Sequence, residues 1–454
     1  MPKVSAIVPC LNMREYIEDC LESIINQTLS EIEILVVDAG STDGTLDILN
    51  RYKQSDKRIR LIHSTKKSYG YQVNLGIRQA VGEYIAIVDA DDRIASDMYK
   101  VLYEEAVFSE ADYVKGIAKS FYTVSDDFTY YMPLRQFPGK EYQKGKIHMI
   151  PAGRTDLLTK DNFLWYGIFR REFMKSIYFH ESPGAAFQDL GALLQTQMKA
   201  QKAIYLEDAF YEYRQDNAMA SNHNPKGFQF VWEEYSWAEQ FIIEASKEWK
   251  AAFYRKLFLH TLSIYATMAA SEIMWENSQN YIHLISEKLA DKLEKGILKK
   301  GHFSSDEWEN LKILLESSGG LFDKFLKMHM DRKKQLQNIM ITAGDRKIVI
   351  FGYGTVGTFI YAQIEKHGLG SVAAFCDNEV KKHGHKYDKV LVLTPAEAAG
   401  LYPEACFVIT SSRYFADMEK QLIYMKIPQS RICAYTEGMD MRMFGTSLVN
   451  DITV

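Results

Sequence analysis

Acidic side chains follow two apolar stretches of this sequence, at the points where each stretch ends. Asp89, Asp91 and Asp92 come after the run 85–88, and Asp38 comes after the run 34–37. Carboxylate oxygens two residues apart suit Mg²⁺ or Mn²⁺, and few protein ligands leave coordination positions for substrate phosphates. Such a metal would neutralise a diphosphate leaving group. Taken alone, the pattern is equally typical of turns and helix caps.

The elements that must position these acids alternate between strand and helix patterns. Apolar runs at 4–8, 32–37, 59–63 and 84–88 are separated by amphipathic stretches at 16–25, 45–52 and 72–80. This alternation predicts βα units around a largely parallel sheet. Ligands bind such open sheets at the carboxyl ends of the strands, where the acids lie. We therefore expect a single site at that edge.

The rest of the chain divides into a helical stretch and a second α/β pattern. Long helix-period segments run from about 228 to 337, and strand patterns return at 347–352, 372–377, 406–410 and 432–435. We predict an α/β fold with three regions: 1–225, a helical region at 226–340, and a small α/β domain at 341–454. Neither repeats nor low-complexity tracts interrupt them.

Composition narrows the functional class. The 454 residues carry 54 Lys and Arg against 59 Asp and Glu, so the net charge of −5 argues against a nucleic-acid partner. Five cysteines, odd in number and without a Cys-x-x-Cys pair, favour a reducing cytoplasm. The sequence starts without a secretory-signal pattern, and its longest apolar helix, near 251–275, contains too many charged residues for a membrane span.

Several motifs occur in an order that resembles the family 2 glycosyltransferases. Pro9 and Asn12 follow the first strand, Asp38 the second, Asn74 lies in a helix pattern, and the Asp89-Ala90-Asp91 group follows the strand at 84–88. The resemblance covers about residues 1–225 and implies a GT-A fold that binds a nucleotide-diphosphate sugar. It implies donor contacts at all these positions: Asp38 to the nucleobase, Asp89 to the ribose or diphosphate, and Asp91 to the metal, Mn²⁺ or Mg²⁺.

The sequence departs from the family pattern at two positions. Ala39 stands where many members have a second Asp, and Gln72 stands where many have an Arg that contacts the diphosphate. Arg214, in a later Tyr-Arg segment, is a candidate to replace that contact, and a plain surface salt bridge is an equally good reading.

An inverting transfer also needs a carboxylate that removes the proton of the acceptor hydroxyl. In the segment 181–191 the family usually has Glu-Asp, and this chain has Gln188-Asp189. The resemblance, closest to a capsule-type subgroup, puts Asp189 in the position of the base. The alternative is a plain helix N-cap, which is the commoner role for an Asp near a helix start.

Trp165 and Tyr166 precede this segment and are candidates to stack on an acceptor sugar. Aromatic side chains more often lie in the core, and that alternative stays open.

A glycine-rich motif opens the third region. Gly352, Gly354 and Gly357 follow a strand, and Asp377 ends the next strand, as in dinucleotide-binding folds. The region resembles small Rossmann-like nucleotide-binding modules of surface-polysaccharide enzymes. The motif predicts a bound nucleotide, with a structural or oligomerisation role as the alternative. No Tyr-x-x-x-Lys pair for hydride chemistry occurs in 341–454.

We therefore expect a metal-dependent, inverting glycosyltransferase that moves a sugar from a nucleotide donor to a glycan or lipid-linked acceptor in surface polysaccharide synthesis. The expected location is the cytoplasm. Scattered bases at 295–300 and 324–334 leave peripheral contact with the inner face of the membrane open, although interrupting acids favour solvated helix faces. Oligomerisation is also open. The rival functions are a sugar-nucleotide oxidoreductase or epimerase and a noncatalytic sugar-binding or scaffolding protein.

Overall fold

The computed structural model describes residues 1–133, 148–149, 154–184, 186–217, 224–271, 273 and 275–436. Contacts divide the chain into two compact units. The first contains residues 1–120, 133–265 and 274–321, and the second contains residues 121–132, 266–273 and 322–454. The predicted boundaries at 225 and 340 do not coincide with this division, and the three-region organisation stays a prediction.

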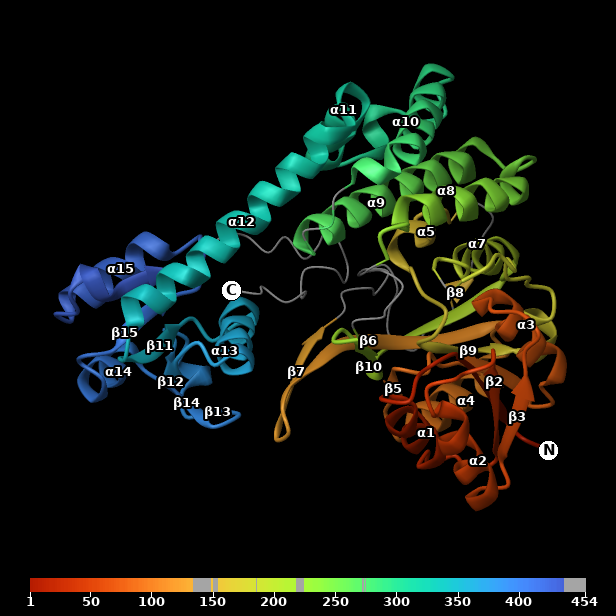
Figure 1. Ribbon diagram of the computed structural model, residues 1–454, viewed down its shortest axis with the longest axis horizontal. Coiled ribbons are helices and arrows are strands. Elements are labelled where there is room, and N and C mark those ends of the chain that lie inside the picture. Colours follow the sequence, from red (N-terminus) through yellow and green to blue (C-terminus); the bar gives the residue numbers. More distant parts are fainter. Residues whose placement is uncertain are drawn as a thin grey trace. The chain divides into compact units, whose positions relative to one another are not determined.

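The first unit is built on a mixed sheet (Figure 1). Its strand order is β3-β2-β1-β4-β9-β6-β10-β5, with β7 beside β6 and β8 beside β10. The strands β1 to β4 are parallel, and β9 runs antiparallel to β4. The strands are β1 (Val4–Cys10), β2 (Ile32–Asp38), β3 (Ile59–His63), β4 (Tyr84–Ile87), β5 (Arg93–Ile94), β6 (Tyr113–Ser125), β7 (Phe128–Pro133), β8 (His148–Met149), β9 (Gly167–Arg170) and β10 (Lys202–Arg214).

Helices cover both faces of this sheet. Alternate residues of β1 point to opposite cores: Val4, Ala6 and Val8 pack with α1, α2 and α4, whereas Ile7 packs with α3, α6 and α7. The helices are α1 (Ile17–Ile25), α2 (Thr45–Ser55), α3 (Tyr69–Gln79), α4 (Met98–Ser109), α5 (Leu157–Lys160), α6 (Arg171–Met174) and α7 (Leu190–Lys199). The helix predicted at 72–80 begins earlier because the Ser68 side chain accepts a capping hydrogen bond from the Tyr71 N–H.

The predicted helical region is confirmed. Its helices are α8 (Gly227–Ala238), α9 (Lys247–Ala270), α10 (Gln279–Glu294), α11 (Ser305–Glu316) and α12 (Ser318–Ala343). Among the residues that the structure describes, no helix is long and apolar enough to cross a membrane.

The second unit contains a smaller sheet with the order β13-β14-β12-β11-β15-β16. All neighbouring strands are parallel except β13, which is antiparallel to β14. The strands are β11 (Lys347–Phe351), β12 (Ser371–Cys376), β13 (Lys386–Tyr387), β14 (Val390–Leu393), β15 (Cys406–Ile409) and β16 (Ile432–Ala434), and the helices are α13 (Thr355–His367), α14 (Pro395–Leu401) and α15 (Phe415–Tyr424). Its core also takes in Tyr122 and Tyr130 from the tip of the β6–β7 hairpin.

Candidate active site

The acid-rich turn after β4 lies at the carboxyl edge of the first sheet, as predicted. Asp92 is fully buried and accepts hydrogen bonds from the Tyr211 hydroxyl (2.7 Å) and the Arg214 N–H (2.8 Å). Asp89 and Asp91 are half-buried. The Tyr69 hydroxyl donates to Asp89 Oδ1 (3.1 Å). Asp92 therefore fixes the turn, and the other two carboxylates remain partly accessible.

The electrostatics of this turn disfavour its own negative charge. Burial, together with the charges of Asp91 and Asp189, raises the pKa of Asp89 to about 7, and the hydrogen bond from Tyr69 opposes this rise. Burial also raises the pKa of Asp91, against the stabilising hydrogen bond from the Asn217 amide (2.7 Å) to its Oδ2. A divalent cation would lower the pKa values of both carboxyl groups, because its positive charge stabilises the ionised carboxylates.

Arg214 lies at the same turn, at the end of β10. Its Nε donates to the Asp91 carbonyl oxygen (2.8 Å), and its guanidinium forms ion pairs with Asp19 (3.2 Å) and Asp216 (3.4 Å). The guanidinium also lies over the Tyr16 ring, 4.9 Å from the centroid. The salt-bridge alternative considered for Arg214 thus finds support, although the arginine side chain itself is only 6% exposed. Contact with a diphosphate stays a prediction.

Polar residues predicted to bind the donor form hydrogen bonds within and between the loops after β1 and β2. The buried Asp38 carboxylate accepts from the N–H groups of Gly40 (2.8 Å) and Ser41 (3.1 Å). Asn12, at φ 55°, accepts from the Thr42 N–H (2.9 Å). Pro9 lies in β1 opposite Val37. These residues shape the edge at which a nucleotide was predicted, and their contacts with a donor stay predictions.

Gln72 has a role that the sequence did not reveal. Its Nε2 donates to the carbonyl oxygens of Cys10 (2.9 Å) and Val37 (2.5 Å). The amide therefore ties the ends of β1 and β2 together at the position where the family resemblance led us to look for an arginine.

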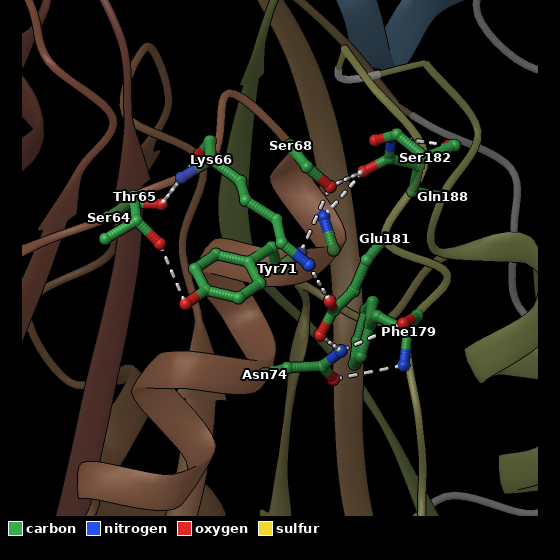
Figure 2. Close-up of polar contacts among 11 residues, drawn as sticks. Ser64, Thr65, Lys66, Ser68, Tyr71, Asn74, Phe179, Glu181, Ser182 and Gln188 are labelled. Carbon is green, nitrogen blue, oxygen red and sulfur yellow. Dashed lines mark hydrogen bonds and ion pairs between the residues drawn. The ribbon is translucent and has the colours of Figure 1, made fainter.

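Asn74 is held in a buried network of the protein itself (Figure 2). Its Nδ2 donates to the Phe179 carbonyl (2.9 Å) and to Glu181 Oε1 (3.1 Å), and its Oδ1 accepts from the Phe179 N–H (3.1 Å). Lys66 completes the network through an ion pair with Glu181 Oε2 (2.8 Å). The structure thus places this amide, predicted to contact the donor, in a clamp between α3 and the segment after α6.

Asp189 occupies the N-cap position of α7, so the helix-cap alternative and the role as base both stay predictions. Its half-buried carboxylate makes no capping hydrogen bond within the described part of the helix. Burial raises its pKa, and this rise is opposed by the charge of Lys256 and by the backbone N–H groups of Asp189 and Leu190. Its own charge contributes to the raised pKa of Asp89 and of the Tyr69 phenol. The charge at the start of α7 therefore acts on the titratable groups of the acid-rich turn.

Trp165 and Tyr166 are core residues, which corrects the prediction that they stack on an acceptor. Trp165 is 4% exposed and stacks between Tyr211 (4.2 Å between ring centroids) and Phe163 (4.4 Å). Tyr166 is 2% exposed, and its hydroxyl donates to Asp161. Neither ring presents a face to an acceptor sugar.

A buried polar network near these aromatics was not predicted. Lys115 and Asp161 form a fully buried ion pair (2.8 Å), and the Tyr205 hydroxyl donates to Asp161 Oδ2 (2.9 Å). Lys256 donates to the Leu158 carbonyl (2.6 Å), and burial lowers its pKa to about 7. In the sequence, the signal for this network is Lys115 within the strand pattern of β6, but that pattern does not identify Asp161 as its partner.

The glycine-rich turn of the second unit is formed as predicted. Gly352 has φ 119°, and a Cβ on Gly357 would lie 2.0 Å from the Gly352 carbonyl oxygen, so both positions require glycine. A Cβ on Gly354 would meet nothing within 4 Å. Asp377 Oδ2 accepts from the Tyr353 N–H (2.8 Å) and pairs with Lys382 (3.0 Å). Nucleotide binding here stays a prediction.

The chain matches two family models. Residues 5–177 match the model described as glycosyl transferase family 2. Residues 344–433 match the model described as C2185-like, N-terminal, so the Rossmann-like assignment of this region is not confirmed. In the described part of the chain, no group of three or more His, Cys, Asp or Glu side chains could hold a metal ion.

Similar proteins agree with the first match. Glycosyltransferase GlyG of Streptococcus pneumoniae serotype 4 is 31% identical over 213 residues, which cover 46% of this chain and 70% of GlyG. The uncharacterized glycosyltransferase EpsJ of Bacillus subtilis is 33% identical over 48% of this chain and 62% of its own length. The crystal structure of S. aureus TarS 1-349 in complex with UDP-GlcNAc has a TM-score of 0.53 at 19% identity, covers 73% of this chain and 92% of TarS 1-349, and shares the fold.

These observations define the class of protein: an α/β transferase fold with acidic turns at the carboxyl edge of its sheet. The chain belongs to glycosyl transferase family 2, and it is a glycosyltransferase.

Proposed function

We propose that this glycosyltransferase moves a sugar from a nucleotide-diphosphate donor to a hydroxyl of a glycan or lipid-linked acceptor in surface polysaccharide synthesis. The observation that carries the proposal is the acid-rich turn at the carboxyl edge of the sheet, where Asp89 and Asp91 stay half-buried while Asp92 and Arg214 hold the turn in place. Perturbed carboxyl groups that interact across two turns are typical of catalytic sites. The donor would lie over the ends of β1, β2 and β4, near Pro9, Asn12, Asp38 and Arg214.

The acid-rich turn fits a divalent metal, Mn²⁺ or Mg²⁺. Asp91, with Asp89 beside it, would supply carboxylate oxygens, and the raised pKa values of both groups indicate a place where positive charge is favourable. A site with so few protein ligands suits an ion that also coordinates phosphate oxygens and water. When bound, the metal would neutralise charge on the departing diphosphate.

Asp189 is proposed as the general base. Its carboxylate is half-buried, and burial moves its pKa upward, which makes it a better proton acceptor near neutral pH. It would remove the proton of the acceptor hydroxyl as that oxygen attacks the anomeric carbon. Attack from the face opposite the departing diphosphate inverts the anomeric configuration.

A panel of UDP-, GDP-, CDP- and dTDP-hexoses with Mn²⁺ tests the proposal. Release of the free nucleoside diphosphate by the full chain, lost in Asp91→Asn and Asp189→Asn, is the expected result. Release that is equal in all three proteins would overturn it.

A further inference from the structure

Gln188, the residue before Asp189, uses both ends of its amide in buried hydrogen bonds (Figure 2). Oε1 accepts from the Gly70 N–H (2.6 Å) and the Ser68 hydroxyl (3.3 Å). Nε2 donates to the carbonyl oxygen (2.6 Å) and the hydroxyl (2.8 Å) of Ser182. The side chain is 1% exposed. Gln188 thus closes the loop that precedes Asp189 and fastens it to the start of α3.

This arrangement requires a side chain that donates and accepts at the same time. Gly70 N–H is a donor and the Ser182 carbonyl is an acceptor, so the amide orientation is fixed. The Ser182 hydroxyl donates onward to Glu234 Oε1 (2.6 Å) and therefore accepts from Gln188. An ionised glutamate would set a carboxylate oxygen against the Ser182 carbonyl. A protonated glutamate has a single O–H, so it could keep the bond to the Ser182 carbonyl but not the second donation to the Ser182 hydroxyl.

The fastened loop leads directly to the acid-rich turn. The Gly184 N–H donates to the Lys67 carbonyl (2.9 Å), and the Tyr69 N–H donates to the Gly184 carbonyl (2.9 Å). The Tyr69 hydroxyl then reaches Asp89. Phe187, at φ 60°, holds a left-handed conformation that costs free energy and persists only where surrounding contacts impose it. The bonds of Gln188 are contacts of that kind.

We propose that Gln188 is the positioning residue of Asp189. Its neutral amide fixes the loop before α7 against α3, and through Tyr69 it sets the separation between the base and the donor-side carboxylates. This inference rests on the proposed function of Asp189. A misplacement of about 1 Å at a reacting group can cost about 10²-fold in rate, so loss of the amide should act mainly on turnover.

The test compares Gln188→Leu and Gln188→Glu with a control on α7, the helix that follows the loop. Gln195 is also buried, and its Nε2 donates to the Tyr178 (2.7 Å) and Gly191 (3.0 Å) carbonyls. Gln195→Leu therefore removes a comparable amide without touching the loop before Asp189. We expect a 10–100-fold lower kcat, about the cost of a misplaced base, in Gln188→Leu, with unchanged donor affinity. Gln195→Leu should lose thermal stability and keep its kcat.

Gln188→Glu tests whether the side chain at position 188 must be uncharged. It also provides a second variant if Gln188→Leu does not fold. The ratio of its kcat to that of the wild type should fall as pH rises, because ionisation of the new carboxyl breaks the bond to Ser182. The charged groups that face this position are Asp189 in the same turn, Glu181 with Lys66, Glu234 with His180, and Asp89 beyond Tyr69. All are present in the wild type, so the ratio reports the new carboxyl together with the shift that its charge causes in these neighbours.

Amide hydrogen exchange distinguishes a failure of the positioning role of Gln188 from a failure of Asp189 as the base. Peptides that contain Tyr69 and Gly184 should exchange faster in Gln188→Leu than in Gln195→Leu, whatever the substrate. Unchanged exchange, or equal losses of kcat in both variants, would overturn the positioning role. Faster exchange together with a fully active Asp189→Asn would instead refute Asp189 as the base, and with it the positioning of a base by Gln188.

Discussion

Both sheets of this protein carry an aspartate beyond the carboxyl end of a parallel strand, but the two residues differ in how the protein treats their charge. Asp377, in the second unit, accepts hydrogen bonds from the N–H groups of Tyr353 and Glu379 and pairs with Lys382. Asp89, in the first unit, has its pKa raised to about 7 because burial and neighbouring acids outweigh its bond to Tyr69. Position at a strand end is thus shared, and the raised pKa distinguishes the proposed transferase site.

The largest effect should come from the metal position. Asp91→Asn, or chelation of divalent ions with EDTA, should abolish detectable turnover, since a metal contributes several kcal/mol to stabilising the leaving charge. The measurement is nucleoside diphosphate release, with circular dichroism as a control for folding. A wild-type rate in the variant, or under saturating chelator, would contradict the metal site.

The base should come next. Asp189→Asn is expected to lower kcat by about 10²–10⁴-fold, because general bases contribute that much to proton transfer. Donor affinity, measured by calorimetry, should not change. Loss of donor binding together with activity would make Asp189 a donor-site or structural residue.

The glycine-rich turn of the second unit offers a pair of stability predictions. Gly357→Ala forces a Cβ to within 2.0 Å of the Gly352 carbonyl oxygen and should cost about 1–3 kcal/mol or more in the free energy of unfolding. Gly354→Ala meets nothing within 4 Å and should cost much less. Urea unfolding measures both variants, and equal losses would show that the turn is not packed as described.

The smallest effect is on protein stability, where replacement of each aspartate by asparagine should change the stability at pH 8 in opposite directions. A raised pKa means that folding favours protonated Asp89, so this contribution to stability is present below about pH 4 and is lost as pH rises through about 7. Without divalent ions, Asp89→Asn should therefore be more stable than wild type at pH 8, with a smaller difference at pH 5. Asp377→Asn should be less stable than wild type at pH 8, because its backbone donors lose a charged acceptor. Thermal unfolding that gives both variants the same sign would remove the distinction.

The sequence was informative where a feature depends on near neighbours. Apolar periodicity predicted the helical region and the parallel strands β1 to β4, but not the antiparallel strands that complete the first sheet. Strand ends predicted that Asp38 and Asp89 lie at one edge, since β1 pairs with both β2 and β4. The family resemblance led us to Arg214, whose side chain hydrogen-bonds to the acid-rich turn, and to Asp189, whose role as the base stays a prediction.

Features that depend on distant parts of the chain could not be predicted. The bond between Gln188 and Ser68 joins residues 120 positions apart, and the Lys115 and Asp161 pair joins residues 46 apart. No local pattern specifies such partners. Whether Trp165 and Tyr166 lie in the core or at an acceptor stayed open for the same reason, because burial depends on which distant strand supplies Tyr211 and Tyr205.

The central claim is that uncompensated carboxylates in the first unit, and not the glycine-rich turn of the second, carry the transfer chemistry. Steady-state turnover of one nucleotide sugar by the full-length wild type, Asp91→Asn and Asp377→Asn tests it most directly. The account predicts no detectable turnover by Asp91→Asn and a rate close to wild type for Asp377→Asn. Retained activity in Asp91→Asn together with loss in Asp377→Asn would contradict it.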